Sequence, residues 1–301
     1  MTSVAPAEKR GLWRLVPSRR SLVIAVPMIW LLVFFLAPFL VVGQISLVDP
    51  AIARPPYTPI WKDGRFLGDL ENYAFLMSDS LYWKAYLSSI RIAAVSTVLA
   101  LVVGYPIAYY IARSEEPRRS ILLLLVILPF WTSFLLRVYA WIGILKTNGI
   151  INNALLGLGI VDTPFVMLQT DFAVYVGIVY TYLPFMILPL YANLVKLDQS
   201  LLEASADLGA YPATTFFRIT VPLSLPGILA GSLLVFVPAI GEFVIPALLG
   251  GPDTLMIGKV LWTEFFNNRD WPVASSVAIA MLMAVVVPIM LLRNRVQEEA
   301  S

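Results

Sequence analysis

The sequence predicts an all-α integral membrane protein with six transmembrane helices. Of its 301 residues, 59% are hydrophobic and only 13% are charged, a composition outside the range of soluble globular proteins. Apolar windows nearly free of charge recur along the chain, each close to the roughly 20 residues that a helix needs to cross a bilayer. No fixed-period repeat or low-complexity tract interrupts them, so a single membrane domain accounts for the chain.

The apolar windows define six spans. The first follows a basic segment and resembles a secretory signal, but its uncharged run from Ser21 to Val48 is longer than the hydrophobic region of a signal. In the fifth, Pro238 lies close to Gly241 and Glu242, with Pro246 beyond them, and this pattern predicts a break in the helix. The predicted spans are residues 22–47, 86–112, 120–145, 172–195, 219–241 and 271–292.

Basic residues indicate the orientation of these spans. An even number of spans places both termini on one side, and Lys and Arg gather on the cytoplasmic side of membrane proteins. Twelve of the 21 Lys and Arg residues fall in the terminal segments and in the loops on their side, against seven in the other loops. We therefore expect both termini in the cytoplasm. The predicted layout is a cytoplasmic tail at 1–21, a membrane domain at 22–292 with a cytoplasmic loop at 196–218, and a second tail at 293–301.

Composition also excludes several kinds of function. The chain has no His and no Cys, which removes Ser-His-Asp and Cys-His catalysis, His-based zinc sites and ordinary haem ligation. A net charge of +2 does not indicate a nucleic-acid partner. The phosphate-binding motif Gly-x4-Gly-Lys-[Ser/Thr] is missing, because the one Gly-Lys pair, Gly258-Lys259, lacks the upstream glycine. We expect no catalytic residue, no metal and no cofactor in this chain.

The loop between the fourth and fifth predicted spans contains two short helices. Ser200 followed by Glu203 matches a capping box, which predicts the start of the first helix, and Gly209 is placed to end it in the left-handed conformation. Pro212 suits the first turn of the second helix. A two-turn helix is too short to be stable alone, so it needs a surface to dock on. That surface belongs either to a partner protein or to the membrane domain itself.

The spacing of this loop resembles the signature of ABC importer permeases, Glu-Ala-Ala-x3-Gly-x9-Ile-x-Leu-Pro. Ser205 and Val221 replace the second Ala and the Leu, and both replacements are conservative in size. In that family the loop forms a coupling helix that sits in a cleft of the cytoplasmic ATPase. The resemblance implies the type I permease fold of ABC importers, with coupling through Glu203, Ala204, Ser205, Gly209, Ile219 and Pro222.

Other stretches resemble the polyamine branch of this family, above all putrescine permeases, and the likeness covers nearly everything from Leu22 to Leu292. It implies a subunit of the bacterial inner membrane that moves polyamine, putrescine in the first place, from periplasm to cytoplasm by alternating access. The implied partners are a second homologous permease, two cytoplasmic ATP-binding subunits, a periplasmic polyamine-binding protein and the lipid bilayer. The stretches are residues 128–141, 175–186, 241–253 and 265–272.

Glu242 lies at the edge of the fifth predicted span, where a carboxylate is costly without a cation or water nearby. Two interpretations stay open: a residue on the pathway of a cationic substrate, and a structural ion pair with Arg137 or Arg91. An alternative function, a self-sufficient secondary transporter of small cations, would use Glu242 to carry a coupling proton. Aromatic side chains could stabilise an ammonium or belong to the interfacial belt. The candidates are Trp131, Tyr139, Trp141, Tyr180 and Tyr182.

Overall fold

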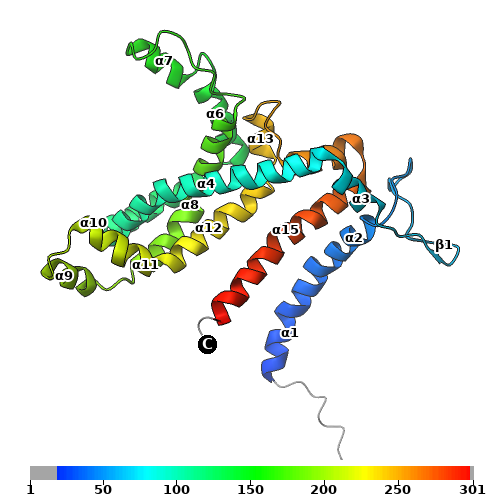
Figure 1. Ribbon diagram of the computed structural model, residues 1–301, viewed down its shortest axis with the longest axis horizontal. Helices are drawn as coiled ribbons and strands as arrows, with labels where there is room; N and C mark the ends of the chain where they lie inside the picture. Colours follow the sequence, from blue (N-terminus) through cyan, green and yellow to red (C-terminus); the bar gives the residue numbers. More distant parts are fainter. Residues whose placement is uncertain (1–18, 299–301) are drawn as a thin grey trace, which may run out of the picture.

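The computed structural model describes residues 19–298, and these residues fold almost wholly into helices (Figure 1). The predicted all-α architecture holds apart from a two-stranded antiparallel ribbon in the first loop, where Trp61 pairs with Phe66. Residues 1–18 of the predicted tail at 1–21, and residues 299–301 of the predicted tail at 293–301, lie outside the described residues. The elements are α1 (Arg19–Leu31), η2 (Leu32–Leu36), α2 (Ala37–Ile45), β1 (Trp61–Lys62), β2 (Arg65–Phe66), α3 (Glu71–Ser78), α4 (Ser80–Arg113), α5 (Arg118–Ile127), η3 (Leu128–Trp131), α6 (Phe134–Leu145), α7 (Ile150–Gly157), α8 (Asp171–Leu194), α9 (Ser200–Asp207), α10 (Pro212–Thr215), η4 (Phe216–Thr220), α11 (Val221–Leu223), α12 (Leu225–Ile240), α13 (Val244–Leu248), α14 (Ile257–Trp262), η5 (Thr263–Asn268) and α15 (Trp271–Glu298).

Three long helices, α4, α8 and α12, pack side by side and form the core of the molecule (Figure 1). Small residues allow this close approach, and Ala93 and Ala100 of α4 are completely buried. Gly231 of α12 lies against Met186 of α8, where a Cβ would come within 3.0 Å of the Met186 carbonyl oxygen. The tight packing of these three helices provides the frame that holds the loops at either end.

Two peripheral helical segments flank this core. The first span is a continuous helical stretch at Val23–Ile45, interrupted only by the π-helical turn η2, and none of its apolar window is buried against the rest of the chain. Its α2 part packs against α15. The helix α15 continues to Glu298, so the last predicted span and part of the predicted tail at 293–301 form one helix.

The third predicted span, residues 120–145, is not one helix. It is divided into α5, a short 3-10 turn and α6, with extended backbone at Thr132. Pro129 in the turn has no amide hydrogen, which removes one helical hydrogen bond. The segment with the length and apolar composition to cross a membrane is instead Phe134–Gly157, formed by α6 and α7.

The fifth predicted span, residues 219–241, is first bent and then broken. The helix turns by 66° between Pro212–Leu223 and Leu225–Ile240. It then ends at Ile240, and the separate helix α13 follows, which confirms the break predicted near Gly241. Among the described residues, four helices could cross a membrane by length and composition, or five if the bent pair counts as one. The sixth predicted span, residues 271–292, lies within α15, which is 28 residues long. Length and composition thus identify four or five of the six predicted transmembrane helices.

The loops and helix ends lie on several sides of the core (Figure 1). The loop containing α9, α10 and α11 lies at the left end of the view, and the start of α1 and the C-terminal end of α15 lie at its bottom. The β1–β2 ribbon and α3 lie at the other end, while α6 and α7 project away from the core.

Candidate coupling loop and central cavity

Helix α9 begins with a cap different from the predicted one. Asp198 accepts a hydrogen bond from the backbone N–H of Ser200 at 3.0 Å, and this bond holds the pKa of the Asp198 carboxyl below its usual value. The capping box predicted for Ser200 and Glu203 is wrong, because the Glu203 N–H bonds to the Gln199 carbonyl and no side chain caps from within the helix. Asp198 lies two residues before Ser200 and accepts the Ser200 N–H, which the Glu203 side chain was expected to accept.

Helix α9 ends as predicted, at a glycine in the left-handed region. Gly209 has φ +72°. Its N–H donates to the Ala206 carbonyl at 2.9 Å, and the Ala210 N–H donates to the Ser205 carbonyl at 3.1 Å. This pair of bonds is the Schellman motif, which satisfies the last carbonyls of the helix. A Cβ at Gly209 would meet no atom within 4 Å, so any penalty for a side chain there comes from the backbone alone.

The two short helices of the loop are tied together and to the core. The buried hydroxyl of Ser205 and the hydroxyl of Thr215 are 2.7 Å apart, a hydrogen bond that the Ala of the family signature could not make. Phe216, which follows α10, packs edge-on against Tyr105 of α4 at 5.4 Å between ring centres. Tyr105 in turn bonds to Ser224 at 2.8 Å. The loop is therefore linked by side chains to the part of α4 that the charge pattern places near the cytoplasm.

The outer surface of this loop carries large exposed apolar side chains. Leu208 is 89% exposed and Tyr211 is 80% exposed, on either side of Gly209 and Ala210. Glu203, Ala204 and Pro222 of the signature are also exposed, whereas Ile219 is half-buried. Exposed apolar side chains on a rigid loop favour a protein contact over packing on the membrane domain itself. Sequence reasoning missed Leu208 and Tyr211, although both lie next to the glycine that it singled out.

Glu242 stabilises the start of α13. Its Oε1 accepts hydrogen bonds from the N–H groups of Phe243 at 3.1 Å and Val244 at 3.0 Å, and its Oε2 accepts one from the Tyr182 hydroxyl at 2.7 Å. The side chain is 8% exposed. Hydrogen bonds from backbone N–H groups and a hydroxyl, rather than a cation, thus offset the free-energy cost of burying this carboxylate.

The ion pairs considered for Glu242 are not formed in the described part of the chain. Arg91 pairs instead with Asp171 at 2.7 Å, and Asp171 also accepts a hydrogen bond from Thr254 at 2.8 Å. Arg137 lines the same cavity as Glu242, but its guanidinium lies over the rings of Phe130 and Phe134. Glu242 therefore has a structural role as a helix cap, and in the described part of the chain it forms no salt bridge with Arg91 or Arg137.

A cavity of about 540 Å³ lies beside Glu242. The guanidinium Nε and Nη1 atoms of Arg137 are buried without a hydrogen-bond partner among the described residues. The cavity therefore combines one carboxylate, one arginine with free donors, and several aromatic faces. Its wall is formed by Phe130, Phe134, Arg137, Thr181, Tyr182, Phe185, Pro238, Gly241, Glu242, Phe243 and Val244.

The structure brings only one predicted aromatic candidate to this cavity, namely Tyr182. Trp141 and Tyr180 pack edge-on against each other at 5.5 Å, outside its wall. Trp131 is 76% exposed and Tyr139 is 57% exposed, and neither lines it. Sequence reasoning missed the four phenylalanines of the wall, because nothing in their spacing distinguishes them from membrane-facing residues.

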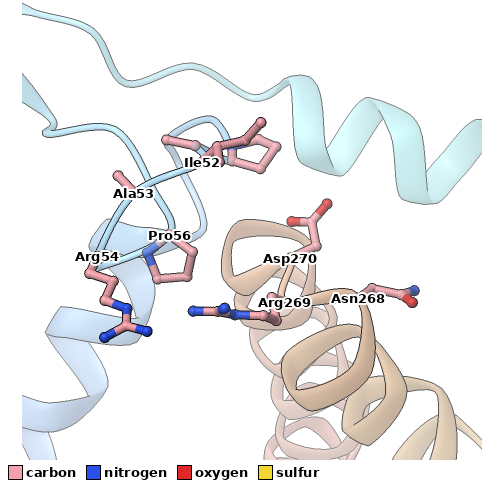
Figure 2. Close-up of a pocket in the computed structure, with 9 residues that line it drawn as sticks. Ile52, Ala53, Arg54, Pro56, Asn268, Arg269 and Asp270 are labelled. Atoms are coloured by element: carbon pink, nitrogen blue, oxygen red, sulfur yellow. The ribbon is translucent and has the colours of Figure 1, made fainter.

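A second polar pocket (Figure 2) lies near the first loop, at the end of the molecule opposite α9 (Figure 1). Its volume is about 660 Å³, and it is formed by the loop at 50–56 and the turn after η5. In Figure 2 the side chains of Arg54 and Arg269 extend toward each other across the pocket, with Asp270 nearby. Arg269 adopts φ +58°, which is uncommon for a residue with a side chain. The pocket is a charged surface at the end of the molecule expected to face the periplasm.

Comparison with known proteins decides the family. The family described as binding-protein-dependent transport system inner membrane component matches residues 104–297, well over half of the chain. The chain belongs to this family. It is accordingly a non-catalytic permease subunit of an ABC importer in the inner membrane, as the resemblance implied. A self-sufficient secondary transporter does not fit a component of a binding-protein-dependent system.

Several relatives of this permease are polyamine transport proteins by name. The spermidine/putrescine transport system permease protein PotB of Salmonella typhimurium LT2 is 42% identical over 266 residues, covering 87% of this chain and 88% of the relative. Its namesake from Escherichia coli K12 is 41% identical over 266 residues, covering 87% and 92%. The Haemophilus influenzae protein of the same name is 40% identical over 270 residues, covering 89% and 91%.

Solved structures confirm the fold of the permease. A bacterial ABC transporter that imports the acidic polysaccharide alginate matches with a TM-score of 0.68 at 16% identity, covering 93% of this chain and 96% of that one. The MetNI methionine ABC transporter, in an inward-facing form, matches with a TM-score of 0.54 at 16% identity, covering 73% and 96%. At such low identity the likeness concerns the fold and not the cargo.

Proposed function

We propose that this permease imports polyamine, with putrescine as the cargo, from the periplasm to the cytoplasm by alternating access. The observation that carries the proposal is identity of 40–42% over 87–89% of the chain to spermidine/putrescine permeases. Identity spread over nearly the whole chain includes the helices around the central cavity as well as the loop. The importer also contains a second homologous permease, two cytoplasmic ATP-binding subunits and a periplasmic polyamine-binding protein.

The loop of α9 and α10 is the proposed contact with the ATPase. Its support is the combination of the signature residues with a rigid internal structure, given by the Ser205 to Thr215 bond and the Schellman end at Gly209. Leu208 and Tyr211 project from it and provide apolar contact area. The distribution of Lys and Arg supports a cytoplasmic position for this loop and for both termini.

The cavity beside Glu242 is the proposed substrate pathway within the membrane. A carboxylate in a region of low dielectric constant lowers the electrostatic cost of an ammonium passing nearby. The faces of Phe130 and Phe134 are partly used by Arg137, so we assign the ammonium contact to Glu242 and Tyr182. Trp131, Tyr139, Trp141 and Tyr180 do not line this cavity and are left out of the proposed pathway.

Uptake by the assembled importer tests the proposal. The permease is reconstituted in proteoliposomes with its sister subunit, its ATPase and its binding protein, and labelled putrescine, spermidine and molybdate are supplied outside. Molybdate is the control, because a molybdenum transport permease is a more distant relative, 30% identical over 215 residues. We expect ATP-dependent uptake of putrescine and none of molybdate. Failure to accumulate either polyamine while ATP is hydrolysed would refute a polyamine cargo.

A further inference from the structure

A polar pocket of about 430 Å³ lies where α4 ends and α5 begins. The predicted span 86–112 ends beside Arg113, the last residue of α4. We therefore expect the pocket to lie where this helix leaves the hydrocarbon core and meets lipid head groups. Its lining residues are Tyr110, Arg113, Ser114, Glu115, Glu116 and Arg118.

Two arginines of this pocket have donors suited to a phosphate. The Nη2 atom of Arg113 is buried and has no hydrogen-bond partner among the described residues. The guanidinium of Arg118 lies 5.0 Å from the ring centre of Tyr110 and also donates to the hydroxyl of that residue, which holds it at the pocket. A buried arginine donor without a partner is costly, and a phosphate oxygen is a strong acceptor for it.

The acidic residues of the pocket differ from each other. Glu116 is engaged at the start of α5, where its Oε2 accepts a hydrogen bond from the Ser120 hydroxyl at 2.7 Å. Glu115 makes no side-chain hydrogen bond or ion pair within residues 19–298. One free carboxylate therefore stands beside two arginines, an arrangement that complements a ligand with both a negative and a positive group.

An apolar groove continues from the polar pocket. Its volume is about 500 Å³, and it lies between α4, α5 and α8. Tyr110 lines both cavities, so they adjoin at this residue. The rest of the groove is formed mainly by aliphatic side chains, including Ile107, Leu122, Val126 and Leu183. Apolar walls of this kind accept a hydrocarbon chain.

We propose that this combined site binds one phospholipid whose head group carries a phosphate and a primary ammonium, as in phosphatidylethanolamine. Arg113 and Arg118 hold the phosphate, Glu115 faces the ammonium, and an acyl chain occupies the groove between α4, α5 and α8. The charge pattern favours this lipid over an anionic one, since Glu115 would repel a head group without a positive charge. The assignment is independent of the cargo and of which leaflet the site faces.

Native mass spectrometry of the full chain tests this site. The protein is purified in detergent, stripped of lipid and titrated with phosphatidylethanolamine and phosphatidylglycerol of identical acyl chains. We expect one tightly held lipid with at least a fivefold preference for phosphatidylethanolamine. Glycerophosphoethanolamine, which has the head group without acyl chains, should bind at least tenfold more weakly than the whole lipid.

Variants assign the binding to the pocket. Arg113→Gln combined with Arg118→Gln should weaken phosphatidylethanolamine binding at least tenfold, and Arg118→Gln alone should weaken it measurably without disturbing a buried group. Arg218→Gln is the control, because Arg218 lies in η4, does not line the pocket and should leave affinity unchanged. Glu115→Gln should remove the preference between the two lipids. The proposal is overturned if the arginine variants bind as the control does, or if phosphatidylglycerol binds more tightly than phosphatidylethanolamine.

Discussion

Glu242 illustrates how one residue can stabilise a break in a membrane helix. The chain stops being helical after Ile240, which leaves backbone N–H groups of the next segment without partners in an apolar environment. The carboxylate of Glu242 accepts hydrogen bonds from three of these groups, those of Phe243, Val244 and Ile245, and one from the hydroxyl of Tyr182. The same residue therefore fixes the local backbone and places a negative charge on the wall of the central cavity.

Substituting Glu242 separates these two roles. Glu242→Gln keeps an oxygen that can accept from the amides but removes the charge, so we expect normal assembly with slower putrescine uptake. Glu242→Ala also removes the cap, and we expect it to lower stability by about 1 kcal/mol or more. Uptake in proteoliposomes and thermal unfolding of the purified complex measure both effects. Wild-type uptake by the Gln variant would show that the charge has no part in transport.

Residue-level expectations from the sequence succeeded where the cause was local. The left-handed conformation of Gly209 was predictable, because only the helix end and the residue type determine it. The capping box predicted at Ser200 was wrong, because Asp198 accepts the Ser200 N–H that the Glu203 side chain was expected to accept. No sequence rule decides between these two carboxylates. The partners of Glu242 could not be chosen from sequence, since Tyr182 is distant along the chain and Arg137 turns toward aromatic rings.

At the scale of elements, α9 and α10 act as one unit attached to α4. The Ser205 to Thr215 hydrogen bond joins the two short helices, and Phe216 packs against Tyr105 and Tyr109 of α4. Such edge-on aromatic pairs contribute on the order of 1 kcal/mol beyond the area that they bury. Movement of the loop is therefore expected to be transmitted to α4 and through it to α8 and α12.

Two neighbouring phenylalanines test this link. Phe216→Ala should lower the thermal stability of the permease by about 1 kcal/mol or more, because it removes contacts with Tyr105 and Tyr109. Phe217→Ala is the control, since Phe217 is 68% exposed and its loss should change stability little. Thermal unfolding of both variants gives the comparison. Equal losses would mean that the aromatic contacts with α4 do not anchor the loop.

Element boundaries were less predictable than element existence. Hydropathy located the apolar stretch at 120–145, but it could not distinguish one continuous helix from α5 and α6 joined by extended backbone. Pro129 looks the same in sequence as prolines that lie within continuous helices, such as Pro106 and Pro184. Whether a helix continues past a proline depends on its neighbours, because packing against other helices can satisfy the backbone carbonyl that the proline leaves without a partner.

At the scale of the whole molecule, the arrangement of helix ends determines which surfaces meet which partners. The loop of α9 and α10 lies at one end of the molecule, at the left of the view (Figure 1). The arginine pocket formed with Arg54 and Arg269 lies at the other end. If the first end is cytoplasmic, the permease presents its loop to the ATPase and the arginine pocket to the periplasm.

Labelling of introduced cysteines tests this orientation, and the chain has no native cysteine to interfere. Asn153 suits the segment at 146–171, since it is exposed, whereas Asn152 is buried and bonded to Phe165. We expect an impermeant reagent to label Asn153→Cys only from the periplasm and Ala206→Cys only from the cytoplasm. The reverse pattern would invert the topology and separate the loop from any cytoplasmic ATPase.

The central claim is that the loop of α9 and α10 transmits the state of the importer to its ATPase, and a pair of glycine variants tests it most directly. Gly209 and Gly159 both have positive φ, at +72° and +66°, and a Cβ at either one meets no atom within 4 Å. A valine at each should therefore carry a similar backbone cost, on the order of 1 kcal/mol or more.

ATP hydrolysis and putrescine uptake are measured together in the reconstituted importer with loaded binding protein. We predict that Gly209→Val inserts and pairs with its sister subunit, yet loses ATPase binding or the response of hydrolysis to the binding protein, while Gly159→Val retains both. A Gly209→Val importer that hydrolyses ATP and takes up putrescine like the Gly159→Val importer would contradict a coupling role for this loop.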